Sequence, residues 1–271
     1  MLYTQFGKLK VSRFILGGNP FAGFSHQGAE KDKEMVKYFT CAKIKKTLAE
    51  AEKLGINAFV GRADNHIIRM LQEYWNEGGK IQWFAQTCPE HGSPEYSVRR
   101  AIDCGAKACH IHGGTMDYFY AQKKLDEAIK AVKLIRDAGL AASVAGHRPH
   151  VFRWAKENLD LDYYMCSYYD PSPRDNRPQH VPEAEENFRE EDRKAMVELI
   201  AEIPKPVVHY KILACGRHNP AEAFAYAAKH MRDFDAVCVG IYTGDLPSML
   251  ADDVRLLEKS IADVKNKGRK K

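Results

Sequence analysis

The hydrophobic pattern of the chain alternates helical stretches with short apolar runs that end in polar residues. Eight such runs occur, at residues 14–18, 56–61, 81–87, 106–112, 140–147, 163–169, 206–213 and 236–242. Because helices of ten or more residues separate the runs, the pattern predicts parallel strands of an α/β protein. Eight repeats in 271 residues favour a single closed (β/α)8 TIM barrel over an open sheet.

Turn and cap residues mark the boundaries of the predicted helices. Helix starts are expected at Ser93-Pro94 and Asn219-Pro220, and helix ends at Gly55, Gly79, Gly105 and Gly139. Two connections, residues 19–33 and 170–187, are longer than usual. Both follow strands at the C-terminal face of the barrel, where such enzymes place their chemistry. The second contains four prolines, and it is interpreted as a lid or, equally well, as a passive surface loop or subunit contact.

Composition narrows the class of protein. We expect one barrel domain over residues 1–264 and a basic tail over residues 265–271, which contributes much of the net charge of +5. Without a basic stripe or a long apolar segment, nucleic acid and membrane are not expected partners. The seven cysteines form no regular framework, so a cytoplasmic location is expected. A small-molecule substrate is the expected partner, with a homo-oligomer possible.

Histidines gather at the predicted strand ends. His110 and His112 alternate with Ile111, so both imidazoles should face the barrel interior, and His112 is the better catalytic candidate because it is nearer the opening. His147 and His209 could converge on the same space. Four neutral imidazoles would suit a divalent transition metal, Zn, Mn, Ni or Fe. The alternative is one core histidine and one acid/base histidine without metal.

Other polar residues near strand ends complete the expected site. Lys211 could act as a base or a Schiff-base amine, or form an ion pair with Asp170 or Asp64. Asp64 could orient a histidine or accept a proton, or it could cap the next helix. The residues expected to contact substrate are Asn19, Arg62, Gln86, Tyr168, Arg217 and Tyr242, with Arg217 beside a helix start that suits an anion.

The segment FGKLKVSRFILGGNPFAG resembles the start of an aldo/keto reductase, in which a short hairpin closes the bottom of the barrel. Weaker similarity continues through GINAF, HIHGG, CSYYD, VVHYKILACG and LPSMLADDVRLL, so it covers most of the chain. The resemblance implies an aldo/keto reductase-like TIM barrel with an N-terminal hairpin.

The resemblance carries over little of the reductase site. The family's catalytic Asp and Tyr fall near Val60 and Asn65, and its Lys falls near Gln86, whereas its His matches His112. The residues that grip the nicotinamide amide are replaced around 145–146 and near Met165. Tyr210 matches the tyrosine on which the nicotinamide stacks. A barrel that lacks the reductase tetrad is therefore expected.

Three functional hypotheses follow. The first is an isomerase, lyase or hydrolase that acts on a small, carbohydrate-like substrate through histidine-centred acid/base or metal-assisted chemistry, with NADP unlikely to bind. The second is a divergent NADP-dependent reductase that uses His112 as the acid. The third is a ligand-binding barrel without catalysis.

Overall fold

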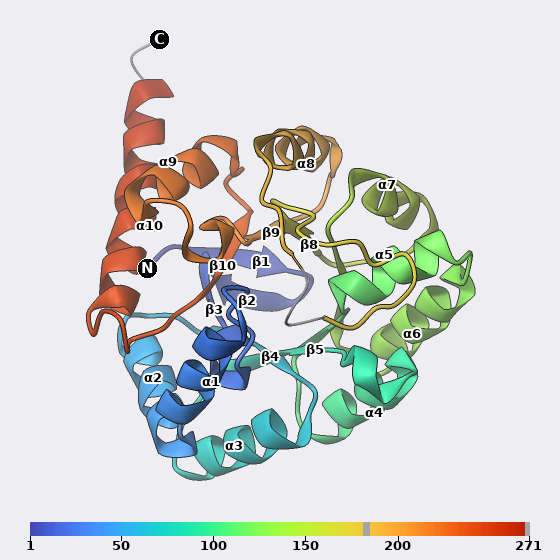
Figure 1. Cartoon of the computed structure of the whole chain (residues 1–271), viewed down its shortest axis with the longest axis horizontal. Helices are drawn as coiled ribbons and strands as arrows, with labels where there is room; N and C mark the ends of the chain where they lie inside the picture. The colour runs from blue at the N-terminus through green and yellow to red at the C-terminus, as the bar shows by residue number, and fades with distance from the viewer. Residues whose placement is uncertain (181–184, 269–271) are drawn as a thin grey trace.

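The computed structural model describes residues 1–180 and 185–268 and confirms the predicted barrel. Eight parallel strands close in the order β10-β3-β4-β5-β6-β7-β8-β9, and a ring of helices surrounds them (Figure 1). The strands are β3 (Phe14–Gly17), β4 (Ala58–Arg62), β5 (Gln82–Gln86), β6 (Ala108–Ile111), β7 (Ala141–Gly146), β8 (Tyr164–Ser167), β9 (Val207–Tyr210) and β10 (Ala236–Gly240). Each strand lies within one of the apolar runs except β4, which extends one residue beyond its run to Arg62.

The helices follow the expected order, with two in the first βα unit and two in the fourth. They are α1 (Ala29–Tyr38), α2 (Cys41–Lys53), α3 (Asn65–Asn76), α4 (Pro94–Asp103), α5 (Gly113–Ala121), α6 (Leu125–Asp137), α7 (Pro149–Asn158), α8 (Glu190–Glu202), α9 (Pro220–His230) and α10 (Met249–Gly268). Short 3-10 turns are η1 (Asn19–Ala22), η2 (Pro89–His91) and η3 (Ala214–Gly216). Within residues 1–180 and 185–268, no helix combines the length and the apolar character that a bilayer span requires.

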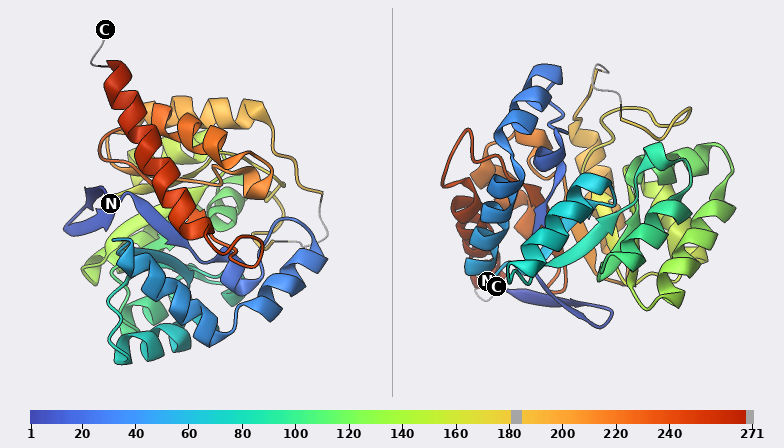
Figure 2. Two further views of the ribbon diagram at one scale, coloured as in Figure 1. Left: turned by 90° about the vertical axis from the view of Figure 1, so that its left-hand side faces the viewer. Right: turned by 90° about the horizontal axis from the view of Figure 1, so that it is seen from below.

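The N-terminal hairpin is also confirmed, and it closes the bottom of the barrel. Strands β1 (Tyr3–Phe6) and β2 (Leu9–Ser12) pair antiparallel. Phe6 enters the inner core and stacks on Tyr163 with ring centroids 4.7 Å apart. Figure 2 shows the hairpin at one end of the barrel and the loop between β8 and α8 at the other. The C-terminal strand ends therefore form the only mouth that the hairpin leaves uncovered.

Alternation along the strands creates two cores. Inward residues such as Ile15, Phe84 and Val208 fill the barrel, while outward residues such as Trp83 and Val207 pack against the helices. The period of two is what a strand with both faces buried requires. It also decides which polar strand-end residues point into the mouth.

Helix boundaries agree with the predicted caps, with one shift. The Ser93 and Asn219 side chains accept hydrogen bonds from the first turns of α4 and α9. Gly55, Gly105 and Gly139 adopt positive φ as expected, but after α3 the left-handed residue is Gly78, with φ of +97°, rather than Gly79.

Two predicted irregular segments are partly helical. The connection over residues 19–33 contains η1 and the start of α1. The expected tail from residue 265 is shorter, because α10 continues to Gly268 and Lys265 forms an ion pair with Asp233 at 3.0 Å. The remaining tail residues, 269–271, lie outside the described residues.

Candidate functional site

The inward faces of β6 and β7 place histidines at the mouth. Ala108 lies in the inner core and Cys109 and Ile111 in the outer one, so alternation directs His110 into the barrel. Its two ring nitrogens are buried and have no hydrogen-bond partner among the described residues. Burial lowers the pKa of His110 to about 3, so the ring is neutral. His112, two residues further along and nearer the opening, is the N-cap residue that directly precedes helix α5.

A buried carboxylate orients His147 at the end of β7. Asp117, on α5, is fully buried, and its Oδ2 lies 2.6 Å from His147 Nδ1. With Nδ1 carrying the proton toward Asp117, His147 Nε2 is left as an acceptor. That nitrogen lies 3.5 Å from the Tyr210 hydroxyl, which is also 3.3 Å from the Gly146 carbonyl oxygen. We call Asp117, His147 and Tyr210 the relay.

The relay is packed so closely that its neighbour must be glycine. A Cβ at Gly113 would lie 2.9 Å from His147 Cε1 and 3.0 Å from the Tyr210 hydroxyl oxygen. Burial, followed by the nearby charge of Asp117, raises the pKa of Tyr210 well above its usual value. Tyr210 therefore keeps its phenolic proton at neutral pH and can serve as a donor.

The loop after β8 covers the mouth and brings an arginine to His112. Arg174 is 5% exposed, and its Nη1 donates to the Gln179 carbonyl at 2.6 Å. A Cβ at Gly114 would lie 3.1 Å from His112 Cε1, 3.3 Å from Arg174 Cδ and 2.6 Å from the Pro178 carbonyl oxygen. Burial, with smaller contributions from the charges of His147 and Arg174, lowers the pKa of His112 well below its usual value.

The loop is held by ion pairs at its base. Arg148, which precedes α7, contacts Asp170 at 2.7 Å and Asp175 at 2.7 Å. At its far side, Glu186 accepts from His26 Nδ1 at 2.7 Å. Residues 181–184 of this predicted lid segment lie outside the described residues. The described part packs over the mouth, and whether it opens and closes stays a prediction.

Lys211 lies in this same region, but with a different partner from those expected. Its Nζ is 2.9 Å from His26 Nε2. It does not share the outward face of His209, because the chain turns left-handed at Lys211, with φ of +56°. In the part of the chain that the structure describes, neither Asp170 nor Asp64 forms an ion pair with Lys211.

Asp64 and Arg62 lie together at the end of β4. Asp64 caps α3 by accepting from the Ile67 N–H at 2.9 Å, and it contacts Arg62 Nε at 2.9 Å. Arg62 also pairs with Glu90 and lies over the Phe24 ring. Asp64 is therefore placed in the capping position that the sequence left open as an alternative.

His209 and Tyr168 lie outside the barrel interior. His209 Nδ1 is 3.0 Å from the Tyr168 hydroxyl, and its Nε2 is 3.5 Å from Asp235 Oδ2. Tyr168 packs edge-on against Tyr226 of α9. These contacts place both side chains between the sheet and the helices, so His209 does not converge with the other three histidines.

The remaining expected substrate residues surround the mouth at different depths. Gln86 ends β5 and is partly buried, whereas Asn19 is exposed at the start of η1. Tyr242 donates to Glu34 at 2.6 Å beside α1. Arg217 is exposed, donates to the His26 carbonyl at 2.9 Å and lies over the Phe188 ring.

The predicted four-histidine metal centre is wrong, because the described residues do not bring the four imidazoles together. In the described ranges, the ligand groups that come within 4.8 Å of one another are His26 with His180 and Glu186, and Asp117 with His147 and Asp170. Neither group contains His110, His112 or His209. His147 is instead oriented by the Asp117 carboxylate.

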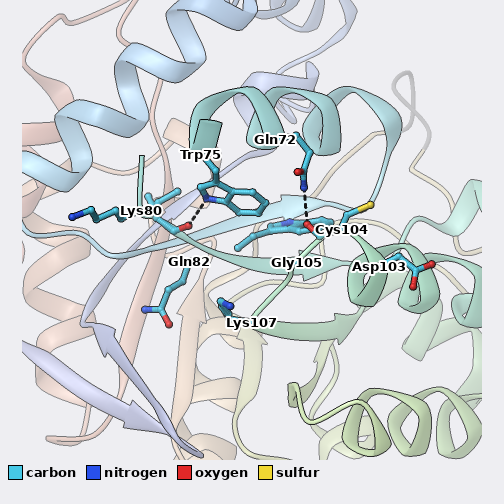
Figure 3. A pocket seen from close by; sticks show the side chains of 10 residues that line it. Gln72, Trp75, Lys80, Gln82, Asp103, Cys104, Gly105 and Lys107 are labelled. Atoms are coloured by element: carbon cyan, nitrogen blue, oxygen red, sulfur yellow. Dashed lines mark hydrogen bonds between the residues drawn. The ribbon is translucent and has the colours of Figure 1, made fainter. Parts of the chain in front are cut away.

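A surface groove of about 470 Å³ lies far from these residues (Figure 3). Gln82 and Lys107 line it at the N-terminal ends of β5 and β6, under α3. Trp75 Nε1 donates to the Ile81 carbonyl at 3.0 Å on one wall, and Gln72 Nε2 donates to the Cys104 carbonyl at 2.9 Å on the other. Because barrel chemistry occurs at the opposite face, this groove is not the candidate site.

Comparison with known proteins supports the aldo/keto reductase resemblance at the level of structure. No protein-family model and no curated protein sequence matches the chain. Among solved structures, a protein described as an aldo-keto reductase from Pseudomonas aeruginosa has 18% identity and a TM-score of 0.64, with 96% of each chain covered. An aldo-keto reductase from Bacillus halodurans, in a holo form, has 14% identity and a TM-score of 0.64 over 98% of this chain and 96% of that one.

A glycerol dehydrogenase from Gluconobacter oxydans is also similar, with 13% identity and a TM-score of 0.57 over 97% of this chain and 94% of that one. At these identities the likeness shows the fold: the chain is an aldo/keto reductase-like barrel. The expected absence of the reductase tetrad stays a prediction.

These neighbours correct two expectations. An isomerase, lyase or hydrolase was the leading hypothesis, whereas the neighbours are reductases and a dehydrogenase, which agree with the alternative of an NADP-dependent oxidoreductase. The expectations of a transition metal and of no NADP go against the same neighbours. The predicted metal-binding histidines instead have partners on other elements, since His147 contacts Asp117 of α5 and His209 contacts Tyr168 and Asp235.

Proposed function

We propose that this protein is an NADP(H)-dependent oxidoreductase that reduces a small carbonyl compound. The observation that carries the proposal is the relay of Asp117, His147 and Tyr210 at the mouth of an aldo/keto reductase-like barrel. A buried carboxylate, an imidazole and a phenol in series form a chain along which one proton can move. The similarity of the fold supports carbonyl reduction as the class of reaction, and Tyr210 of the relay is the acid that this reaction requires.

The donor set around the mouth fits a dinucleotide phosphate. Lys211 and Arg217 form no ion pair with a carboxylate in residues 1–180 and 185–268. Arg217 and Lys211 flank η3, on the loop that follows the seventh barrel strand, where barrels often bind phosphate. The partly buried ring of Tyr210 offers an apolar face beside them. These residues would hold the cofactor's phosphates and bound its nicotinamide.

In the proposed reaction, the reduced cofactor supplies the hydride that adds to the carbonyl carbon. Tyr210 holds the proton that the carbonyl oxygen takes up, and its raised pKa keeps that proton in place beforehand. His147 is the adjacent group through which the phenol regains a proton. Before that transfer His147 Nε2 takes up a proton from solvent, Asp117 stabilises the resulting imidazolium, and the imidazole is neutral again once the phenolate has taken the proton. His112 is neutral, and we assign it the role of a hydrogen-bond donor that orients the carbonyl oxygen.

The test combines cofactor binding with turnover. Titration with NADPH should quench tryptophan fluorescence, and a panel of small aldehydes and ketones should include one that consumes NADPH. Tyr210→Phe keeps the ring but removes the hydroxyl, so it should lower kcat by roughly 10² to 10⁴-fold and leave the NADPH Kd nearly unchanged. The exposed Tyr96 gives the matched control, Tyr96→Phe. No NADPH binding, or unchanged kcat in Tyr210→Phe, contradicts the proposal.

A further inference from the structure

We infer that the carbonyl substrate is an anion, and that its carboxylate or phosphate group is bound by Arg174 and the N-terminus of α5. This inference rests on the proposed function for the identity of the site and extends it to the class of substrate. It starts from the charge balance around Arg174, which the relay does not use.

Arg174 is a buried cation whose neighbouring carboxylates are already paired. Asp117 contacts His147 at 2.6 Å, Asp170 contacts Arg148 at 2.7 Å, and Glu186 contacts His26 at 2.7 Å. Over the described ranges, no carboxylate lies within ion-pair distance of Arg174, and its partners are the Gln179 carbonyl and His180 Nδ1, the latter at 3.5 Å. The charges of Glu186, Asp117 and Asp170 act on Arg174 only from beyond ion-pair distance and burial still lowers its pKa, so a bound anion in direct contact would offset the remaining cost of burying the guanidinium.

The start of α5 faces the same region with further unpaired groups. Helix geometry leaves the N–H groups of Gly113 and Gly114 without an intrahelical acceptor, and no side chain caps them. Thr115 Oγ1, in the same first turn, and His112 Nδ1 are buried without a hydrogen-bond partner among the described residues. The N–H groups of Gly113 and Gly114, the Thr115 hydroxyl and the positive end of the helix dipole favour an anion.

The glycines bring these groups together. A Cβ placed on Gly114 would contact the His112 ring, Cδ of Arg174 and the Pro178 carbonyl oxygen. A Cβ placed on Gly113 would contact the Tyr210 hydroxyl. An anionic group between Arg174 and the start of α5 would therefore hold a carbonyl attached to it near Tyr210 and His112. A 2-oxo acid or a short phosphorylated aldehyde has this arrangement of groups.

Binding without turnover gives the first arm of the test. Oxamate, which carries a carboxylate but no reducible ketone, and inorganic phosphate should each bind the cofactor-free protein, as measured by calorimetry. Arg174→Gln should raise the Kd of whichever of these two anions binds more tightly by about tenfold to a hundredfold, because a hydrogen bond to a charged group contributes roughly 1.5 to 3 kcal/mol. The exposed Arg177 of the same loop gives the control, and Arg177→Gln should bind like the unaltered protein. Equal binding by Arg174→Gln and the unaltered protein overturns the inference.

Turnover gives the second arm and separates the two proposals. Arg174→Gln should lower kcat/KM for glyoxylate or glyceraldehyde 3-phosphate by about tenfold or more, while kcat/KM for the uncharged acetaldehyde and the Kd for NADPH stay within about twofold. An equal loss for charged and uncharged carbonyls, or a weakened NADPH Kd with unchanged anion kinetics, overturns the inference. If anions bind through Arg174 but no carbonyl is reduced, the proposed function fails and the anion site stands.

Discussion

The amine of Lys211 lies 2.9 Å from Nε2 of His26, and both residues adopt left-handed backbone conformations, with φ of +56° and +58°. The two residues are 185 positions apart in the chain and belong to the loops after the seventh and the first barrel strand. A left-handed conformation is unfavourable for residues with a Cβ, so both loops hold strain that the contact between them helps to offset.

We predict that Lys211→Met raises the pKa of His26. Burial is the main cause that lowers this pKa, and the positive charge of Lys211 is the second. Removing that charge favours the protonated imidazole, which Glu186 can stabilise from its other nitrogen. NMR titration of the His26 ring protons measures the shift. Lys205→Met, a change far from the mouth, is the control, and an unchanged His26 pKa in Lys211→Met would contradict the prediction.

This contact also shows where sequence reasoning ends. The strands and their polar ends could be predicted because alternation and capping are local properties. Continued alternation from His209 would place Lys211 on the same face, but β9 ends at Tyr210 and the left-handed turn redirects the lysine. No local pattern indicates that turn or the partner His26, because the contact joins two distant loops.

The relay was missed in part for a similar reason. The sequence analysis names His147 as a strand-end histidine and Tyr210 as the match to a family tyrosine, but it predicts no role for Asp117. A signal existed: Asp117 is the single charged residue in the otherwise apolar segment GGTMDYFYA, directly after the HIHGG motif. A buried charge in an apolar helix indicates a specific partner. Arg174 has no such signal, because its burial depends on how an irregular loop folds over the mouth.

We predict that Asp117→Asn lowers kcat by about 10² to 10⁴-fold. An asparagine that donates to His147 Nδ1 would force the proton onto Nε2, which then could not accept from Tyr210. Steady-state kinetics on the carbonyl that the panel identifies, together with the NADPH Kd, measures the effect. Asp126→Asn, at the exposed start of α6, is the control. A lowered NADPH affinity with unchanged kcat would show that Asp117 acts on binding instead.

Arg148 should control how firmly the loop over residues 170–187 is closed. Its guanidinium holds Asp170 and Asp175, and the hydrogen bonds that it donates to their carboxylates raise its pKa despite burial. We predict that Arg148→Ala speeds tryptic cleavage after Arg174 severalfold, because Arg174 is buried while the loop is closed and the loop loses its anchor. Arg153 lies on α7, the helix that Arg148 precedes, and forms an exposed ion pair with Glu202 of α8. Arg153→Ala should therefore leave the cleavage rate unchanged. Mass spectrometry of timed digests locates the cut, and equal rates in all three proteins would count against the anchor.

Asp253 gives a prediction about stability that is independent of function. Its side chain is buried on α10 and makes no hydrogen bond to a described residue, and burial, with a smaller effect of Asp252, raises its pKa to about 7. In the unfolded chain the pKa returns to about 3.9. The folded state therefore binds this proton more tightly, and its contribution to stability is full below about pH 4 and is lost as the pH rises to about 7.

We accordingly predict that Asp253→Asn stabilises the protein at high pH and not at low pH. At pH 8 the buried carboxylate costs the parent protein at most about 4 kcal/mol, since each pKa unit corresponds to about 1.4 kcal/mol. At pH 4 both side chains are neutral, so the two free energies of unfolding should nearly coincide. Urea unfolding at a series of pH values measures the difference, with Asp263→Asn on the exposed face of α10 as the control. A difference that does not grow between pH 4 and pH 8 would mean that Asp253 finds a stabilising partner for its charge in the folded protein.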